Sequence, residues 1–361
     1  MSATAVENEH SHDEHHHDHP SWLAHHFDDA EQQFDSGKLG MWLFLVTEVL
    51  FFSGMFCAYA LLRSSNPEVF NYCSAFLNEK LGAINTGVLL FSSLTMAWAV
   101  RAAQLSQHKL LVALLGITLG CAAVFLGVKT VEYSHKWDLG LLPGKLYVSQ
   151  VDHPHHEGMP TALPYLQAPG VVLAIIFGAW WLFAVGKRDR FQMEVAGPLL
   201  IAALCYIGGA ALGLYLESQE AAAHEAHAAE TAHSHADHAA APAVAGDAKP
   251  ADAVPDRDSL ITPVQSHLDT VPAAPVAQAV PSPEVNQKGK AGLFFSVYYC
   301  MTGVHALHIL GGMAVISWLI VKAARHEFHS KYFGPVDNVG LYWHLVDFIW
   351  IYLFPLLYLI T

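Results

Sequence analysis

Seven apolar runs, each long enough to cross a lipid bilayer, constrain this chain more than any other feature. A helix of about 20 apolar residues spans a hydrocarbon core of ~30 Å. Hydrocarbon offers no partner for unpaired backbone groups, so each run should be helical. The composition agrees, because 53% of the 361 residues are hydrophobic and 14% are charged, against about 25% charged in soluble domains. We therefore predict an all-α, polytopic membrane bundle. Its seven transmembrane helices should cover residues 39–62, 82–103, 110–133, 169–186, 197–216, 292–321 and 336–360.

Changes in composition divide the chain into five parts. Residues 1–37 form an acidic, histidine-rich tail without an apolar signal segment, so we expect the first span to act as the insertion signal. Residues 38–137 hold three spans, and residues 138–216 hold a polar loop and two more. Residues 217–290 are rich in Ala, His and Pro, and we expect them to be disordered. Residues 291–361 hold the last two spans.

The distribution of Lys and Arg predicts the orientation, because short cytoplasmic loops carry an excess of both. Nine basic residues fall on the side of the N-terminus and four on the other side. This predicts a cytoplasmic N-terminus, an external C-terminus and an external linker in a cell membrane. The net charge of −14 argues against binding of nucleic acid by the tail and linker. The nine are Lys38, Arg101, Lys109, Lys187, Arg188, Arg190, Lys322, Arg325 and Lys331, and the four are Arg63, Lys80, Lys136 and Lys145.

Glu48 is the clearest candidate for a functional residue inside a span. It lies ten residues after Lys38, or ~15 Å into the membrane at 1.5 Å per residue. An acidic residue at the centre of a span costs about 2.5 to 3.5 kcal/mol on insertion, so its presence needs a reason. One interpretation is a proton-handling or gating group that faces a partner subunit. The other is a protonated acid hydrogen-bonded between helices.

Two further polar pairs occur in the last two spans. His305 and His308 are three residues apart and share a helix face, as do His344 and Asp347. Such a set could bind a metal or haem, but that requires ligands that converge from facing helices. We favour hydrogen bonding between helices, worth ~0.6 kcal/mol per side chain in membranes. The five cysteines show no metal-site spacing, so we assign no metal ligand.

Five stretches, in order along the chain, resemble the cytochrome c oxidase subunit III family. They are residues 40–52 (GMWLFLVTEVLFF), 81–86 (LGAINT), 131–133 (VEY), 302–308 (TGVHALH) and 342–347 (YWHLVD). The resemblance covers about half of the chain. It implies a partner of subunits I and II in an oxidase that passes electrons from cytochrome c to oxygen and pumps protons. It also implies that haem and copper lie in those partners, with no catalytic residue in this chain.

The resemblance also implies roles for single residues. Glu48 matches the family's intramembrane glutamate, near the mouth of the proton-uptake path, with a regulatory or structural role. Asn85 and Glu132 lie in the matching stretches, and with the His and Asp residues above we expect them to be structural polar groups. The family holds phospholipid in a cleft between helices, and Lys322 aligns with its basic residue at the inner end of the sixth span. Lys322 is therefore a candidate for a lipid phosphate, although an ordinary positive-inside anchor explains it equally well.

The chain departs from the family in its architecture. Long members begin with two extra spans before the glutamate-bearing helix, which here comes first. Instead, residues 139–287 intervene between the third and fourth family-like spans and contain two spans of their own. An even number of inserted spans keeps the last two helices in the family's orientation. Whether the inserted pair replaces the missing helices stays open at this point.

Other functions fit parts of the pattern. The third subunit of a quinol oxidase, or of a nitric-oxide-reductase system, would share these motifs. The histidine-rich tails, the HxxH motif and the HxxD motif also fit a metal-ion transporter. The tails lack a fixed ligand spacing, so weak, adventitious metal binding is the simpler interpretation for them.

Overall fold

The computed structural model describes residues 27, 29–147, 162–239 and 285–359, and within them the regular elements are all helical. Seven of these helices are long and apolar enough to cross a membrane, as predicted. A short helix α2 (Pro67–Ser74), a turn of 3₁₀-helix (Gly144–Leu146) and a π-helical turn after α8 (Pro355–Leu359) complete the fold. The seven are α1 (Ala30–Ser65), α3 (Glu79–Gln104), α4 (His108–Asp138), α5 (Leu163–Lys187), α6 (Arg190–Ala239), α7 (Val285–Ala324) and α8 (Gly334–Phe354).

Local sequence signals explain where several helices begin and end. The side chain of Asp29 accepts a hydrogen bond from the backbone N–H of Gln32 at 2.7 Å and caps α1. Asn78 caps α3 in the same way through the N–H of Leu81 at 3.0 Å. Both residue types are preferred N-caps because their side-chain oxygens satisfy a free N–H of the first turn. Arg188 ends α5 with a φ of 54°, in the left-handed region, and allows the immediate return into α6.

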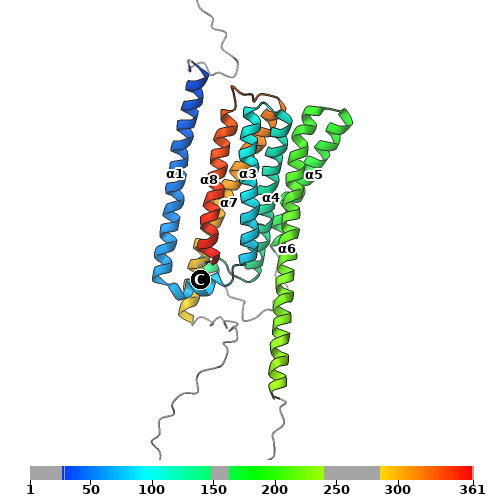
Figure 1. Cartoon of the computed structure of the whole chain (residues 1–361). Coiled ribbons are helices and arrows are strands. Elements are labelled where there is room, and N and C mark those ends of the chain that lie inside the picture. Colours follow the sequence, from blue (N-terminus) through cyan, green and yellow to red (C-terminus); the bar gives the residue numbers. More distant parts are fainter. Residues whose placement is uncertain (1–26, 28, 148–161, 240–284, 360–361) are drawn as a thin grey trace, which may run out of the picture.

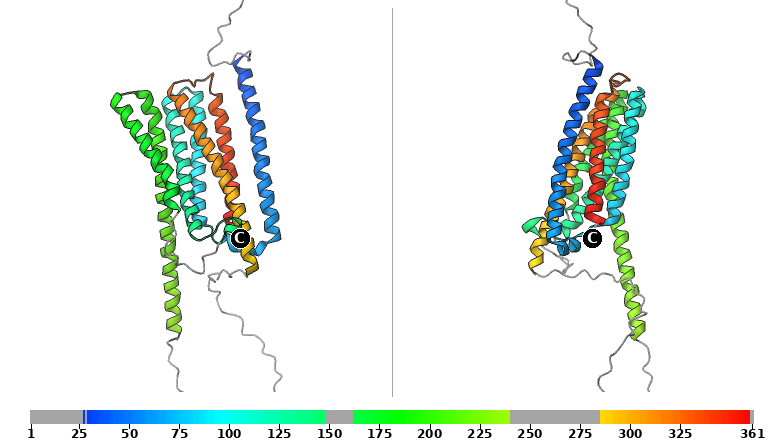
Figure 2. Two further views of the ribbon diagram at one scale, coloured as in Figure 1. Left: turned by 180° about the vertical axis from the view of Figure 1, so that it is seen from behind. Right: turned by 60° about the vertical axis from the view of Figure 1, so that its left-hand side comes forward.

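The helices stand side by side, with α1 at one edge of the bundle and α5 at the other (Figure 1). The second view agrees with this order (Figure 2). Helix α4 is central: 72% of its membrane span is buried, against 17% for α1 and 11% for α5. The core of the bundle therefore lies around α4, which packs against α3, α6 and α7.

Glycines bring α4 and α6 together at close range. A Cβ at Gly127 would collide with the backbone of Tyr206 and Ala210, and one at Gly209 would collide with the backbone of Val124. Small residues let membrane helices approach closely enough for backbone-to-backbone packing. The inserted pair of helices is thus anchored on α4, on the side of the bundle away from α1 (Figure 1). The sequence alone does not predict where the inserted pair packs.

Three boundaries differ from the sequence prediction. Helix α6 continues to Ala239, so residues 217–239, predicted to be disordered, are helical and project beyond the other helices (Figure 1). The reason is local composition, since this stretch is dominated by Ala and Glu, which favour helix. Residues 240–284 of the predicted linker lie outside the described residues, and its last part, residues 285–290, is also helical because α7 begins at Val285. Helix α1 begins at Ala30, inside the predicted tail, of which residues 1–26 also lie outside the described part.

The connections define two ends of the bundle. The start of α1 lies at the same end as the α3–α4, α5–α6 and α7–α8 connections, which we call the N-side (Figure 1). The end of α8 and helix α2 lie at the opposite end, the C-side. One residue of the basic count was assigned wrongly: Lys136 is not in a loop but near the end of α4, where it is 2% exposed.

Candidate functional site

Glu48 on α1 meets His308 on α7 near the middle of the bundle. Glu48 Oε2 lies 2.9 Å from His308 Nε2. The other ring nitrogen, Nδ1, lies 2.8 Å from the carbonyl oxygen of Val304. A carbonyl only accepts, so Nδ1 carries a proton and one further proton lies between Nε2 and the carboxyl group. The two residues are therefore either a neutral acid bonded to a neutral imidazole or an ion pair, and the shift of one proton interconverts them.

The surroundings of this pair are mostly aromatic, and the pair is partly open. The rings of Phe52 and Phe51 lie 5.1 and 6.4 Å from the His308 ring. The hydroxyl of Tyr342 donates to the carbonyl oxygen of His308 at 2.9 Å. The side chains of Glu48 and His308 remain 18% and 21% exposed. A polar pair that reaches the surface of a membrane bundle calls for a polar neighbour there, because hydrocarbon cannot solvate it.

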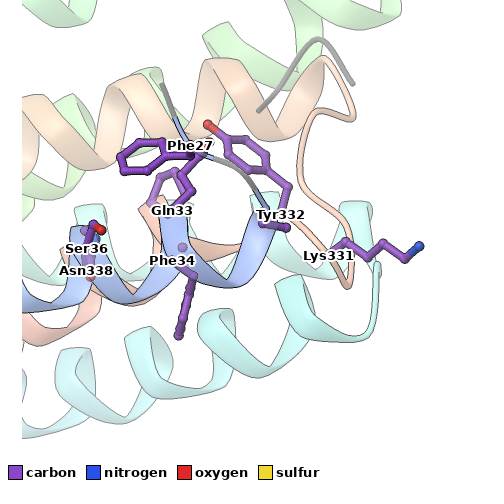
Figure 3. Close-up of a pocket in the computed structure, with 11 residues that line it drawn as sticks. Phe27, Gln33, Phe34, Ser36, Lys331, Tyr332 and Asn338 are labelled. Carbon is purple, nitrogen blue, oxygen red and sulfur yellow. The ribbon is translucent and has the colours of Figure 1, made fainter. Parts of the chain in front are cut away.

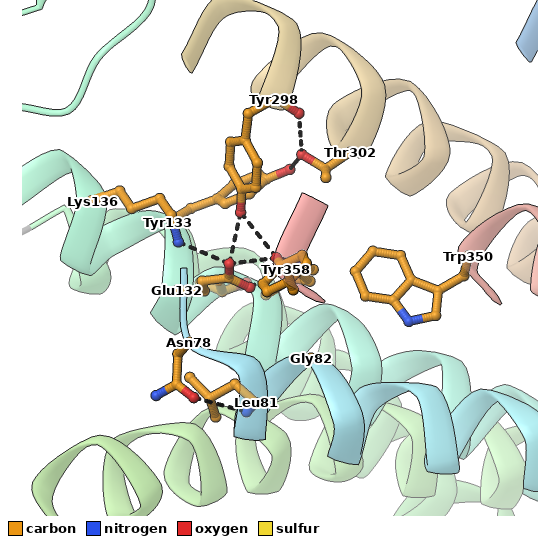
Figure 4. Close-up of polar contacts among 12 residues, drawn as sticks. Asn78, Leu81, Gly82, Glu132, Tyr133, Lys136, Tyr298, Thr302, Trp350 and Tyr358 are labelled. Atoms are coloured by element: carbon orange, nitrogen blue, oxygen red, sulfur yellow. Dashed lines mark hydrogen bonds and ion pairs between the residues drawn. The ribbon is translucent and has the colours of Figure 1, made fainter. Parts of the chain in front are cut away.

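Glu132 lies in a second, fully buried cluster near the C-side (Figure 4). Its Oε1 accepts hydrogen bonds from Lys136 Nζ at 2.8 Å, Tyr298 OH at 2.7 Å and Tyr358 OH at 2.6 Å. Its Oε2 accepts from Lys129 Nζ at 2.7 Å. The cluster joins α4, α7 and the π-helical turn after α8. We call these five residues the Glu132 cluster.

Sequence reasoning found only Glu132 of this cluster. The sequence prediction did not include Lys129 and assigned Lys136 to a loop. Nothing in the sequence around the two tyrosines distinguishes them from other aromatic residues in the spans. The pattern that could have found the lysines is their spacing: Lys129, Glu132 and Lys136 follow each other at three and four residues, on one helix face. When both lysines and Glu132 are charged, the cluster carries a net charge of +1. The ring of Trp350, 4.5 Å from Lys129 Nζ, offers that charge a cation–π contact.

His305 and His308 do not converge on one site. His305 is fully buried, stacks on Trp350 at 5.4 Å and meets the edge of Phe125 at 5.7 Å. Within the described part of the chain, neither ring nitrogen of His305 has a hydrogen-bond partner. The same is true of the side-chain amide of Asn85, which is also buried. The shared helix face predicted for the two histidines therefore leads to two different environments.

His344 and Asp347 both meet helix α3. His344 Nδ1 lies 2.6 Å from Ser93 Oγ, and Asp347 Oδ2 lies 3.4 Å from Ser92 Oγ. The indole N–H of Trp343 donates to the same Ser92 hydroxyl at 3.1 Å. Across residues 29–147, 162–239 and 285–359, no group of three or more His, Cys, Asp or Glu side chains is placed to hold a metal ion.

The family model described as cytochrome c oxidase subunit III matches residues 22–137 and 279–361, more than half of the chain. The chain belongs to the cytochrome c oxidase subunit III family. The resemblance seen in the sequence is thus confirmed. The unmatched residues between the two ranges contain α5 and α6, which fits their interpretation as an insertion.

Curated relatives match over shorter segments. Cytochrome c oxidase subunit 3 of Thermostichus vulcanus is 40% identical over 74 residues, which are 20% of this chain and 36% of the relative. Heme-copper oxidase subunit I+III of Aeropyrum pernix is 37% identical over 71 residues, 19% of this chain and 9% of the relative. Probable cytochrome c oxidase subunit 3 of Mycobacterium tuberculosis is 38% identical over 65 residues, 18% of this chain and 32% of the relative. The chain thus spans about a third or less of these relatives' lengths, and no solved structure matches it.

The polar residues of the five subunit III motifs lie on α1, α3, α4, α7 and α8, and none lies on the inserted pair. Motifs that are far apart in sequence meet in space, since Glu48 of the first lies against His308 of the fourth, and the hydroxyl of Tyr133 of the third lies 2.7 Å from that of Thr302 of the fourth. The subunit III motifs therefore describe one bundle of five helices, to which α5 and α6 are added from outside.

Lys322, the candidate for a lipid phosphate, already has a partner. Its Nζ lies 2.9 Å from Glu327 Oε2 and 4.9 Å from the centre of the Trp318 ring. A phosphate would therefore have to compete with the Glu327 carboxylate. Arg325, directly after the end of α7, is more open, with a side chain that is 60% exposed.

At the N-side, a clamp joins α1 to α8 beside a shallow pocket (Figure 3). Lys38 Nζ lies 3.0 Å from Asp337 Oδ2, and the rings of Phe34 and Phe333 are 5.3 Å apart. The pocket has a volume of about 510 Å³ and combines aromatic with polar side chains, while Lys331 extends away from the other labelled residues. Helix α1 is thus held at its N-side end as well as at Glu48.

Proposed function

We propose that this chain is the non-redox subunit III of a respiratory haem-copper oxidase in the cell (inner) membrane. Its partners are subunits I and II, which carry the haem and copper, and the complex takes electrons from cytochrome c, reduces oxygen and pumps protons. Membership of the family supports this proposal. A relative whose printed name joins subunits I and III in one protein supports contact with subunit I.

The observation that carries the proposal is the pair formed by Glu48 and His308. It lies near mid-membrane, holds one proton between its two side chains and reaches the surface of the bundle. The proton of this pair can move between Glu48 and His308 without breaking a helix contact, because each of the two states keeps the 2.9 Å hydrogen bond. We assign Glu48 a supporting role in proton uptake by subunit I, with no bond-making step.

The orientation is part of the same proposal. The N-side carries the start of α1 and three short connections, and most of the basic residues counted for this side lie in or close to these connections. The positive-inside rule therefore favours an N-side that faces the cytoplasm. The end of α8 and the projecting part of α6 then lie outside.

A structural phospholipid also belongs to the proposal. Helices α4, α5, α6 and α7 line an apolar groove with a volume of about 320 Å³. Ser317, in the groove wall, precedes Lys322 on α7 by five residues, or about 7.5 Å. A lipid chain in the groove would place its phosphate near Lys322 and Arg325, which fits an anionic headgroup.

Purification of the chain with its partners tests the function directly. The tagged chain is extracted from its native membrane in mild detergent, and the complex is analysed for haem absorption and for a subunit II with the cysteines of a copper site. We expect haem, subunits I and II and oxidation of cytochrome c. Oxidation of quinol instead would change the donor but keep the subunit assignment. Purification without any haem-bearing subunit, together with metal uptake into liposomes, would establish the transporter instead.

A further inference from the structure

Asp347 is a third carboxyl group inside a membrane span, and no cation among the described residues forms an ion pair with it. The residue is 2% exposed and lies between α8 and α3. Its Oδ1 has no hydrogen-bond partner among the described residues, and its Oδ2 is 3.4 Å from Ser92 Oγ. The titratable side chains around it are Cys121 on α4 and His344 on α8 itself. This contrasts with Glu132, whose carboxylate two lysines neutralise.

The hydrogen bonds of Ser92 indicate whether Asp347 is ionised or neutral. A serine hydroxyl has one proton to donate and two lone pairs that accept. The Ser92 proton is already directed at the carbonyl oxygen of Leu89, 2.8 Å away, and Trp343 donates to one lone pair at 3.1 Å. An ionised Asp347 would therefore receive no hydrogen bond of good geometry from Ser92. A neutral Asp347 can donate its own proton to the second lone pair.

Burial favours the same form. An ionised carboxylate in an apolar environment, without a counter-charge, is so unfavourable that the group binds a proton instead. The neighbouring hydroxyls offer hydrogen bonds but no positive charge. Geometry and desolvation thus both indicate a neutral acid at this position.

A route for the proton leads from Asp347 to the surface of the bundle. Ser93 lies beside the Asp347 carboxyl group without a direct hydrogen bond to it, and its Oγ lies 2.6 Å from His344 Nδ1. His344 is only partly buried, and Phe348, one turn further along α8, is 57% exposed. Ser93 therefore connects a buried acid to a histidine that reaches the outside of the bundle.

We propose that Asp347 is a second proton-binding site of this subunit, whose proton exchanges through Ser93 and His344 with the face between α3 and α8. In the transfer, the O–H of Asp347 turns from Ser92 to Ser93 and gives its proton to Ser93 Oγ, while Ser93 gives its own proton to His344 Nδ1. His344 then loses the proton on Nε2 to an acceptor at that face. One proton leaves, Asp347 becomes a carboxylate and His344 ends as the other neutral tautomer. The site stands on its own residues and does not require the role proposed for Glu48.

Infrared spectroscopy of the intact oxidase complex tests the protonation. We expect a carbonyl band of a neutral carboxylic acid at pH 7 that shifts when aspartate is labelled with ¹³C and disappears in Asp347→Asn. Glu48→Gln, the matched control, should leave this aspartate band in place. If Asp347→Asn does not assemble, Ser92→Ala should still shift the band, because the acceptor of the acid's hydrogen bond is lost. An aspartate spectrum that neither substitution changes would show that Asp347 is ionised and overturn the site.

Exchange of the same band with deuterium tests the route and separates it from a purely structural acid. After transfer into D₂O, Ser93→Ala and His344→Phe should each slow the deuterium shift of the Asp347 band several-fold. Glu48→Gln should leave the rate unchanged. An unchanged rate in both Ser93→Ala and His344→Phe would refute the route while leaving the protonated site intact.

Discussion

Glu132 and Glu48 are both acidic residues inside a membrane bundle, but their surroundings differ in every respect that matters. Glu132 accepts four hydrogen bonds, two of them from lysines, and its side chain is 2% exposed. Glu48 has one partner, His308, and remains 18% exposed. The first arrangement surrounds a carboxylate with cations and joins three segments. The second places one proton between two side chains and leaves one side open. The same side chain is thus enclosed in one place and, in the role we propose, exchangeable in the other.

The largest effect should follow from Glu132→Gln. This change leaves Lys129 and Lys136 facing each other in the interior without a counter-charge. Breaking a buried ion pair by removal of one partner costs about 3–5 kcal/mol. We expect the chain to be lost from the complex, or its thermal unfolding in detergent to occur at a much lower temperature. The matched control is Glu31→Gln, an exposed glutamate at the start of α1, which should have no effect.

Lys129→Met should cost less, although it removes a charge from the same cluster. Lys136 and Glu132 remain as a neutral pair, and the loss is limited to hydrogen bonds and the contact with Trp350. Hydrogen bonds to charged groups contribute about 1.5–3 kcal/mol each, part of which Lys136 and the tyrosines retain. The double variant Glu132→Gln, Lys129→Met should be more stable than Glu132→Gln alone in the same unfolding assay. A double variant less stable than either single one would contradict the charge balance inferred for the cluster.

Glu48→Gln should leave stability nearly unchanged and alter function. The amide of Gln can still donate to His308 Nε2, so the helix contact survives, with a change below about 1 kcal/mol. The mobile proton, however, is gone. We expect normal haem content and assembly, together with slower proton uptake or altered resistance to inactivation during turnover, measured on the purified complex. Loss of the whole complex would show that Glu48 is structural in the same sense as Glu132.

The sequence predicted the spans and Glu48 for a simple physical reason: hydrocarbon imposes length and apolarity, and an acid within such a run stands out. It could not predict the partner of Glu48, because His308 lies 260 residues away in the chain and only packing brings them together. Lys136 was mistaken for a loop residue, since a lysine near the end of a span resembles an anchor until its buried partner is seen. Asn85 and His305 were expected to bond between helices, and their bonding partners are not among the described residues.

The position of the inserted pair was beyond sequence reasoning for a related cause. Apolar runs reveal that α5 and α6 cross the membrane, but every face of such a helix is apolar, so the pattern does not show which face packs. The contact is specified by the absence of side chains at Gly127 and Gly209. The prediction of disorder for residues 217–239 was wrong because it relied on their lack of large apolar residues. Ala and Glu favour a helix even where no apolar face can be buried.

The smallest effect should come from Lys38→Ala, which opens the N-side clamp between α1 and α8. Lys38 is 38% exposed, and an exposed ion pair contributes about 0.2–1 kcal/mol. The dependence of stability on salt concentration distinguishes this ion pair from the Glu132 cluster. The loss caused by Lys38→Ala should fade as ionic strength rises, because exposed charges are screened, whereas the loss caused by Glu132→Gln should persist. Thermal unfolding of both variants at low and high salt measures this difference. If the Lys38→Ala deficit were as large as that of Glu132→Gln and insensitive to salt, α1 would depend on its clamp far more than its exposed position indicates.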